Sequence, residues 1–106
     1  MKFFTRNKIN KENLSDEELL LEYKATNDSE YFGALYNRYI PLIYGLCLKY
    51  LQEEEKAQDA VMDIFENLVT KINNYEVKVF RTWVYSVAKN HCFQVLEKNK
   101  RELVVD

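Results

Sequence analysis

Apolar residues recur every three or four positions along most of this chain, which is the period of one face of an α-helix. The cleanest stretch predicts a helix over residues 53–72, with apolar side chains at Ala57, Ala60, Val61, Ile64, Phe65, Leu68, Val69 and Ile72. A second stripe predicts a helix over residues 79–98, with Phe80, Trp83, Val84, Val87, Ala88 and Val95. Each pattern is that of an amphipathic helix that buries one side and exposes the other.

Two more helical stretches precede these. Ser15 followed by Glu18 is a capping box, in which each side chain bonds the backbone amide of the other residue, so a helix is predicted over residues 16–26. A longer stretch, residues 29–51, has an apolar stripe of its own. Pro41 lies inside that stretch and removes one backbone hydrogen bond, so we expect a kink or a break there.

The predicted fold class is all-α, a compact bundle of about four helices. Only 2 glycines and 1 proline occur among 106 residues, which argues against a turn-rich β fold. Residues 1–14 are polar and basic without periodicity and are predicted to form a flexible arm. Residues 15–106 are predicted to form one helical domain, with a polar linker at residues 73–78.

The net charge is −2, but the charges are segregated along the chain. Acidic side chains dominate residues 12–30 and 52–66, whereas basic ones dominate residues 1–11 and 71–101. This pattern suggests two partner surfaces of opposite charge, although solvated helix faces would produce it as well. The basic end of the last predicted helix is suited to a polyanion such as nucleic acid.

An acidic ridge is predicted on the outer face of the helix over residues 53–72. Glu55, Asp59 and Asp63 are spaced four residues apart, where like charges mildly destabilise an isolated helix. Such a ridge suits a cationic partner, and it suits a simple solubility face equally well. A metal ion at Asp59 and Asp63 would need a second carboxylate pair from another helix, and the sequence indicates none.

No constellation typical of an enzyme is found, and no cofactor is predicted. His91 is the only histidine and lies on an apolar stripe, where a structural role is favoured over a catalytic one. Cys47 and Cys92 fit reduced, partly buried thiols better than a disulfide framework. No apolar run is long enough to span a bilayer and the N-terminus lacks a signal-peptide core, so we expect a cytoplasmic location and no membrane insertion.

Two tyrosines stand apart from the predicted core. Tyr75 lies in the linker, and Tyr85 lies off the main stripe of the last helix. An exposed ring can stack on an unpaired base, which contributes on the order of 1–3 kcal/mol per base. Tyr75 could equally fold back over the core.

Three segments of the chain follow the motifs of one protein family in order. They are FGALYNRYIPLIYGLCLKYL (residues 32–51), KAQDAVMDIFENLV (residues 56–69) and FRTWVYSVAKNHCF (residues 80–93). Together they resemble the second conserved region of bacterial RNA polymerase sigma factors, of the extracytoplasmic-function (ECF) group. The resemblance extends over residues 16–101. It implies an all-helical domain that acts in transcription initiation and has no enzymatic activity.

The resemblance implies that the helix over residues 53–72 binds the coiled-coil clamp helices of the largest subunit of the RNA polymerase core. The polymerase-binding residues implied in this way are Asp59, Met62, Asp63, Phe65 and Glu66. Phe65 would anchor beneath the carboxylates. Met62 stands where the family usually has glutamine, which removes one polar contact.

The resemblance also implies that the linker and the last helix recognise and melt the minus-ten promoter element and hold its non-template strand. The linker would capture a flipped base, Asn90 would read the sequence, and basic side chains would hold phosphates. The DNA-binding residues implied in this way are Asn74, Tyr75, Lys78, Arg81, Lys89, Asn90, Lys98, Lys100 and Arg101. The family often has Asp and Arg where this chain has Gln94 and Glu97.

These departures leave a second interpretation open, a divergent helical protein-interaction module that keeps the fold without reading DNA. Such a module would bind the polymerase or an anti-sigma factor. Only the first function requires salt-dependent, sequence-selective affinity for single-stranded DNA. Nothing in the chain resembles the family's fourth region, the helix-turn-helix that reads the upstream promoter element.

Overall fold

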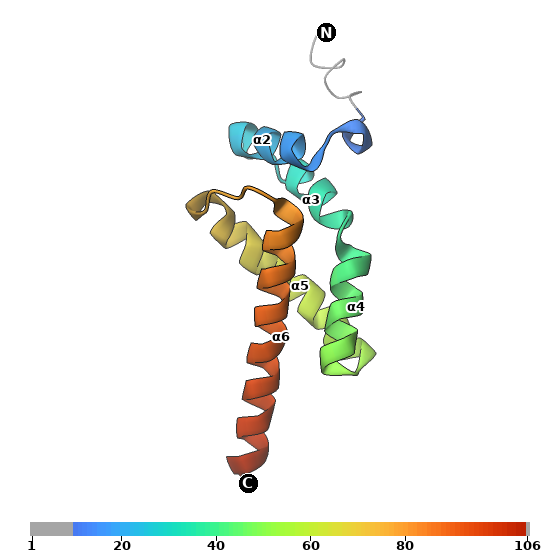
Figure 1. The fold of residues 1–106 in the computed structure, drawn as a ribbon, viewed down its shortest axis with the longest axis vertical. Coiled ribbons are helices and arrows are strands. Elements are labelled where there is room, and N and C mark those ends of the chain that lie inside the picture. Colours follow the sequence, from blue (N-terminus) through green and yellow to red (C-terminus); the bar gives the residue numbers. More distant parts are fainter. Residues whose placement is uncertain (1–9, 106) are drawn as a thin grey trace. The chain divides into compact units, whose positions relative to one another are not determined.

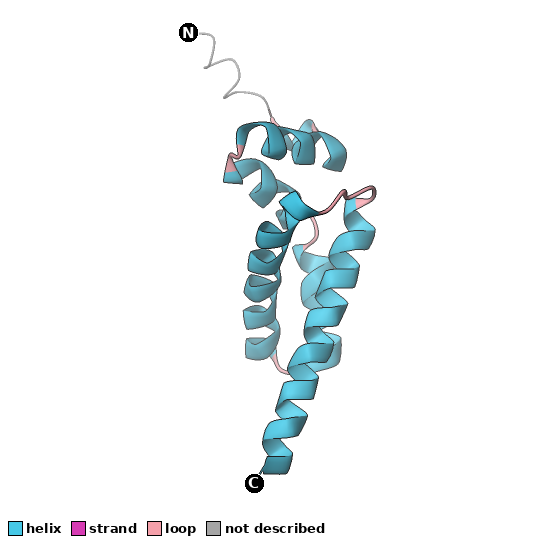
Figure 2. Cartoon of the chain, turned by 90° about the vertical axis from the view of Figure 1, so that its left-hand side faces the viewer, coloured by secondary structure: helices cyan, strands magenta, loops and turns pink. Residues whose placement is uncertain are grey.

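Helices make up the regular structure of residues 10–105, the part of the chain that this computed structural model describes, and no strand occurs among them (Figures 1 and 2). The predicted all-α fold class is therefore confirmed. Contacts divide the chain into two units, the first ending at Arg38 and the second beginning at Tyr39. Residues 1–9, the larger part of the predicted basic arm, lie outside the described residues. Near the end of that arm, Lys11–Asn13 form the 3-10 turn η1.

The first unit pairs two short helices, α2 (Asp16–Thr26) and α3 (Ser29–Asn37). The predicted capping box begins α2: the Ser15 hydroxyl accepts from the Glu18 amide at 3.0 Å, and the Glu18 carboxylate accepts from the Ser15 amide at 2.8 Å. The bounds of α2 are those predicted. The two helices bury apolar and aromatic side chains, namely Leu19, Leu20, Tyr23, Tyr31, Phe32, Leu35 and Tyr36.

Arg38 fastens the segment before α2 to the end of α3. Its guanidinium donates to the Asp16 carboxylate at 2.9 Å and to the backbone carbonyls of Lys11, Glu12 and Leu14. A planar guanidinium with five N–H donors can serve several acceptors at once, which a lysine ammonium on its flexible stem does less well. The positive charge of Arg38 is therefore paired with acceptors of the first unit.

Pro41 marks the break that the sequence predicted. α3 ends at Asn37, and a separate helix, α4 (Ile40–Leu51), has Pro41 in its first turn, where the missing amide removes no intrahelical hydrogen bond. Gln52 ends α4 in the left-handed region with φ 63°. The predicted stretch over residues 29–51 thus comprises two helices.

The second unit packs α4 with α5 (Glu54–Lys71) and α6 (Phe80–Val105), and the three helices lie side by side (Figures 1 and 2). A 3-10 turn, η2 (Ile72–Asn74), ends α5 and occupies the first part of the predicted linker. The predicted end of the last helix at residue 98 was wrong, because α6 continues to Val105. Its last turns run past α4 and α5 (Figure 2), and Lys98, Lys100 and Arg101 there are exposed.

Small residues let α6 approach α4 closely. The buried side chains of this unit are Ile43, Leu46, Cys47, Leu51, Ala57, Ala60, Val61, Ile64, Leu68, Ile72, Phe80, Val84, Ala88 and Cys92. The sulfur atoms of Cys47 and Cys92 are 3.7 Å apart, and both thiols are free. Burial raises the pKa of the Cys47 thiol to about 12 and also raises the pKa of Cys92, so both groups stay protonated and unreactive.

Candidate functional site

The outer face of α5 carries the predicted acidic ridge. Asp59, Met62, Asp63 and Glu66 are exposed, Met62 to 64%, whereas Phe65 is partly buried. The buried residues of α5 fall on the opposite side, so the helical period itself turns these side chains outward. Carboxylates around an exposed thioether suit a partner that offers cations and an apolar strip.

A hollow of about 170 Å³ lies between this ridge and α6, with Asp59, Asp63 and His91 in its lining. The Nε2 atom of His91 is 3.9 Å from Oδ2 of Asp63, which is too long for a hydrogen bond. This nitrogen is buried and has no hydrogen-bond partner among the described residues. The imidazole therefore lies behind the ridge, a position that agrees with a structural role.

The linker after α5 forms a second candidate site. Asn74, Tyr75 and Lys78 are exposed, and the Tyr75 ring centre lies 6.2 Å from that of Trp83 in α6. A hollow of about 430 Å³ is lined by Lys78 together with Glu76, Val79 and Trp83. Tyr75 keeps 52% of its surface exposed, so it contacts α6 and still offers ring surface to a ligand.

The predicted DNA-binding side chains of α6 do not share one face, and Arg81 and Lys98 lie on neither of the two faces that the other residues occupy. Asn90 and Arg101 are three helical turns apart and share one face, whereas Lys89 and Lys100 share another face about 100° away. Lys89 is partly buried. The others are exposed, namely Arg81, Asn90, Lys98, Lys100 and Arg101.

One exposed surface was not predicted. The ring of Phe93 in α6 meets that of Tyr50 in α4 edge-on, with 5.2 Å between ring centres. Phe93 is 44% exposed and Leu96 is 37% exposed. Both are apolar residues that fall outside the main apolar stripe of α6. This position off the stripe was the only sign in the sequence that they would be exposed. Their proximity to α4 could not be read from the spacing.

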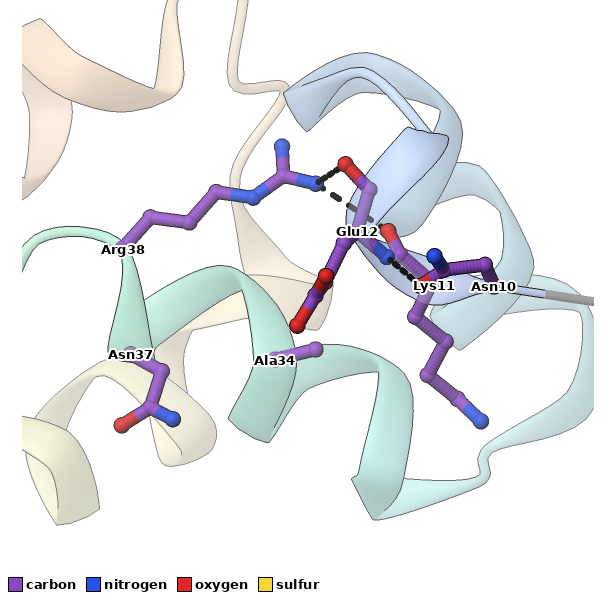
Figure 3. Close-up of a pocket in the computed structure, with 6 residues that line it drawn as sticks. All are labelled: Asn10, Lys11, Glu12, Ala34, Asn37 and Arg38. Carbon is purple, nitrogen blue, oxygen red and sulfur yellow. Dashed lines mark hydrogen bonds between the residues drawn. The ribbon is translucent and has the colours of Figure 1, made fainter.

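The first unit has a hollow of about 470 Å³ (Figure 3), lined by Asn10, Lys11, Glu12, Ala34, Asn37 and Arg38. The Arg38 guanidinium already donates to backbone carbonyls and to Asp16. The ammonium of Lys11 lies 3.4 Å from the Glu30 carboxylate. Because both cations already have partners within the unit, we assign this hollow no ligand.

Among residues 10–105, no group of three or more His, Cys, Asp or Glu side chains could hold a metal ion. No helix in this part of the chain is both long enough and apolar enough to cross a membrane.

Residues 35–102 match the protein family described as Sigma-70 region 2, and this match covers more than half of the chain. The chain belongs to the Sigma-70 region 2 family. The matched part of this Sigma-70 region 2 chain begins within α3 and extends into α6. It contains every side chain predicted above to bind polymerase or DNA.

The Sigma-70 region 2 chain is 26% identical over 80 residues to the ECF RNA polymerase sigma factor SigW of Bacillus subtilis (strain 168). The alignment covers 74% of this chain and 43% of SigW, so the chain spans less than half the length of that relative. No solved structure matches the chain. The similarity to SigW agrees with the ECF group that the sequence motifs indicated.

We predict that His91 makes the fold less stable in mild acid. Burial lowers its pKa below the usual 6.5, and the Asp63 carboxylate opposes this shift only in part. The unfolded chain then binds a proton more readily than the folded one, so stability that is fully present above pH 6.5 is lost as the pH falls through 6.5 toward the folded pKa. The urea midpoint should fall with pH in this window, and it should fall less in His91→Gln. Equal pH dependence in both proteins would contradict the prediction.

Proposed function

We propose that this Sigma-70 region 2 chain is the part of an ECF-group sigma factor that binds the RNA polymerase core and opens the promoter. In this role it catalyses no reaction and acts by binding two partners at once. Family membership and similarity to SigW support the proposal. The observation that carries it is the separation of charge: carboxylates are exposed on α5, whereas residues 77–96 contain no acidic side chain.

The polymerase half of the proposal concerns the ridge on α5. Asp59 and Asp63 are exposed on the same side of the helix, with Met62 between them. A coiled coil that presents basic side chains would pair with these carboxylates, and apolar contact with Met62 would take the place of the family's polar contact. Because the other side of α5 is part of the core, the ridge is held rigid before binding, which lowers the entropy lost on association.

The DNA half of the proposal concerns the linker and the start of α6. A flipped base is held by stacking and by hydrogen bonds in a pocket. The hollow is lined by Lys78, Glu76 and Trp83, and the exposed ring of Tyr75 lies 6.2 Å from the Trp83 ring. The exposed Asn90 amide can both donate to and accept from a base edge. Arg101 shares the face of Asn90, so a strand read by the amide could continue to a phosphate contact.

Charge reversal on the ridge should abolish polymerase binding without unfolding the chain. Asp59→Lys combined with Asp63→Lys replaces attraction with repulsion at two positions, so affinity for the isolated clamp coiled coil should fall roughly a hundredfold or more. Both side chains are exposed, so the helical circular dichroism signal should not change. Calorimetry measures the affinity.

The matched control reverses Glu17 and Glu22 of α2, two exposed carboxylates outside the ridge, and changes the net charge by the same amount. It should bind the coiled coil as the parent chain does. Undiminished binding by the ridge variant, or an equal loss in the control, would show that the assignment to α5 is wrong.

Tyr75→Ala should weaken binding of the minus-ten non-template strand. Loss of one stacking ring costs on the order of 1–3 kcal/mol, or about tenfold in affinity. The assay is fluorescence anisotropy of the chain bound to core polymerase, with single-stranded oligonucleotides selected by that complex from a randomised pool. Leu21→Ala, which truncates an exposed side chain of α2, should have no effect.

This assay distinguishes the two interpretations of the sequence, a sigma factor region that reads DNA and a protein-interaction module that does not. A sigma factor region should select oligonucleotides, and its affinity should fall as salt rises. If the complex forms but no sequence is enriched, the DNA half is wrong. The chain would then be a protein-interaction module that keeps the fold, with the polymerase or an anti-sigma factor as its partner.

A further inference from the structure

His91 is a titratable side chain of α6 that lies directly behind the acidic ridge of α5. Its Nε2 atom is 3.9 Å from Oδ2 of Asp63. This nitrogen is buried and has no hydrogen-bond partner among residues 10–105. A buried polar atom without a partner is uncommon in a folded protein and calls for an explanation. A proton on this nitrogen would act on the Asp63 carboxylate, and so on the charge of the ridge.

The charged side chains that line the hollow beside His91 all belong to α5. They are Lys56, Asp59 and Asp63, whereas α4 contributes Leu51 and α6 contributes Val95 and Asn99. The Lys56 ammonium lies 3.4 Å from the Glu53 carboxylate, so its charge is already paired. Asp63 is the side chain whose charge opposes the effect of burial on the pKa of His91. His91 and Asp63 are therefore the coupled pair at this place.

The two members of this pair differ in exposure. The Asp63 side chain is 60% exposed and lies on the ridge, so a cation of a partner protein can reach it. The His91 side chain is only 13% exposed, so the same partner acts on it mainly through Asp63. Salt screens a partly buried interaction of this kind less than one between fully exposed charges.

The charge of His91 determines what Asp63 offers to a partner. Burial lowers the pKa of His91 below 6.5, so the imidazole is neutral at pH 7 and the carboxylate keeps its full attraction for cations. A protonated imidazole would pair with that carboxylate, because an opposite charge at this distance favours the charged form. A cationic partner would then meet a compensated carboxylate with a positive charge behind it.

We infer that a proton on His91 and a cationic partner on the α5 ridge oppose each other's binding, so that the ridge releases its partner in mild acid. The inference rests on the proposed function where the partner is the RNA polymerase core. The opposition itself holds for any partner that pairs a cation with Asp63. Coupling between two ligands is reciprocal, so the partner also expels the proton. His91 thereby regulates the ridge without contacting the partner.

The affinity for a cationic partner should fall as the pH falls. A bound partner engages Asp63 and adds positive charge nearby, so it lowers the pKa of His91 further. The complex then binds a proton less readily than the free chain does. Affinity that is fully present above pH 6.5 is therefore lost as the pH falls through 6.5 and the pKa of the free chain. A loss of about fivefold or more is expected, as is typical of coupling between two binding events.

The test measures the affinity of the full 106-residue chain for two cationic probes by fluorescence anisotropy. One probe is the isolated clamp coiled coil of the polymerase. The other is a helical peptide without histidine that has arginines four residues apart, the spacing of Asp59 and Asp63. Measurements at about pH 7.5, 6.5 and 5.5 bracket the ordinary titration of histidine. Circular dichroism at each pH checks that the chain is folded.

Three variants separate His91 from the other charges of the ridge. His91→Gln removes the titrating group, so it should bind about as the parent does at pH 7.5 and keep that affinity at pH 5.5. Asp63→Asn and Asp59→Asn each remove one exposed carboxylate and should both bind more weakly at pH 7.5. Of these two, only Asp59→Asn should retain the fall in affinity with pH, because Asp63 is the carboxylate beside His91.

A spectroscopic measurement reports the proton itself. His91 is the only histidine of the chain, so its imidazole gives a single titrating NMR signal. The bound arginine peptide should move this titration to lower pH. If His91 affected only the stability of the fold, its titration would be the same in the free and the bound chain.

Equal pH dependence in the parent and in His91→Gln would overturn the inference, and so would a titration that the peptide leaves unmoved. If the peptide behaves as expected but the coiled coil binds at no pH, the inference holds and the proposed function fails. If the coiled coil binds equally at all three pH values, the inference fails and the proposed function stands. Absence of binding by both probes contradicts both.

Discussion

The close packing of α6 on α4 and α5 is the contact on which the rest of the second unit depends. The buried line of α6 consists of Phe80, Val84, Ala88 and Cys92. Small side chains in that line let the backbones approach, and the sulfur of Cys92 comes within 3.7 Å of that of Cys47. Once this line is fixed, the helical period determines the direction of the other side chains. His91 meets α5, Phe93 meets α4, and Asn90 stays exposed.

This packing gives a small helical unit several faces of different chemistry. The ridge of α5 places like charges four residues apart, at a cost of a few tenths of a kcal/mol per pair in an isolated helix. Burial of the opposite side of α5 offsets that cost, since helices in proteins are stabilised mainly by packing. The acid-free stretches of α4 and α6 form the contrasting faces. A protein partner with cations and a polyanionic strand can therefore bind without sharing a surface, which is what a Sigma-70 region 2 domain requires in the role proposed here.

Local signals in the sequence predicted most of the fold. The capping box at Ser15 predicted the start of α2, and Pro41 predicted the break before α4. Both predictions succeeded because each residue affects backbone hydrogen bonds within a single helical turn. The end of α6 was missed because the polar and charged residues 97–102 interrupt the apolar period before the helix ends. The pairing of Cys47 with Cys92 and of Tyr50 with Phe93 was missed for another reason: these contacts join distant segments, and no spacing encodes them. The different faces of the predicted DNA-binding residues on α6, by contrast, follow from their spacing along one helix.

The central claim is that the α5 ridge meets the polymerase and the linker meets the promoter strand. Hydroxyl-radical footprinting tests it directly, because Met62 and Tyr75 are oxidisable and are 64% and 52% exposed. Core polymerase alone should protect Met62 and leave Tyr75 reactive, and added promoter DNA should then protect Tyr75. Met62 that stays fully reactive in the complex, or Tyr75 that stays reactive after DNA binds, would contradict the account.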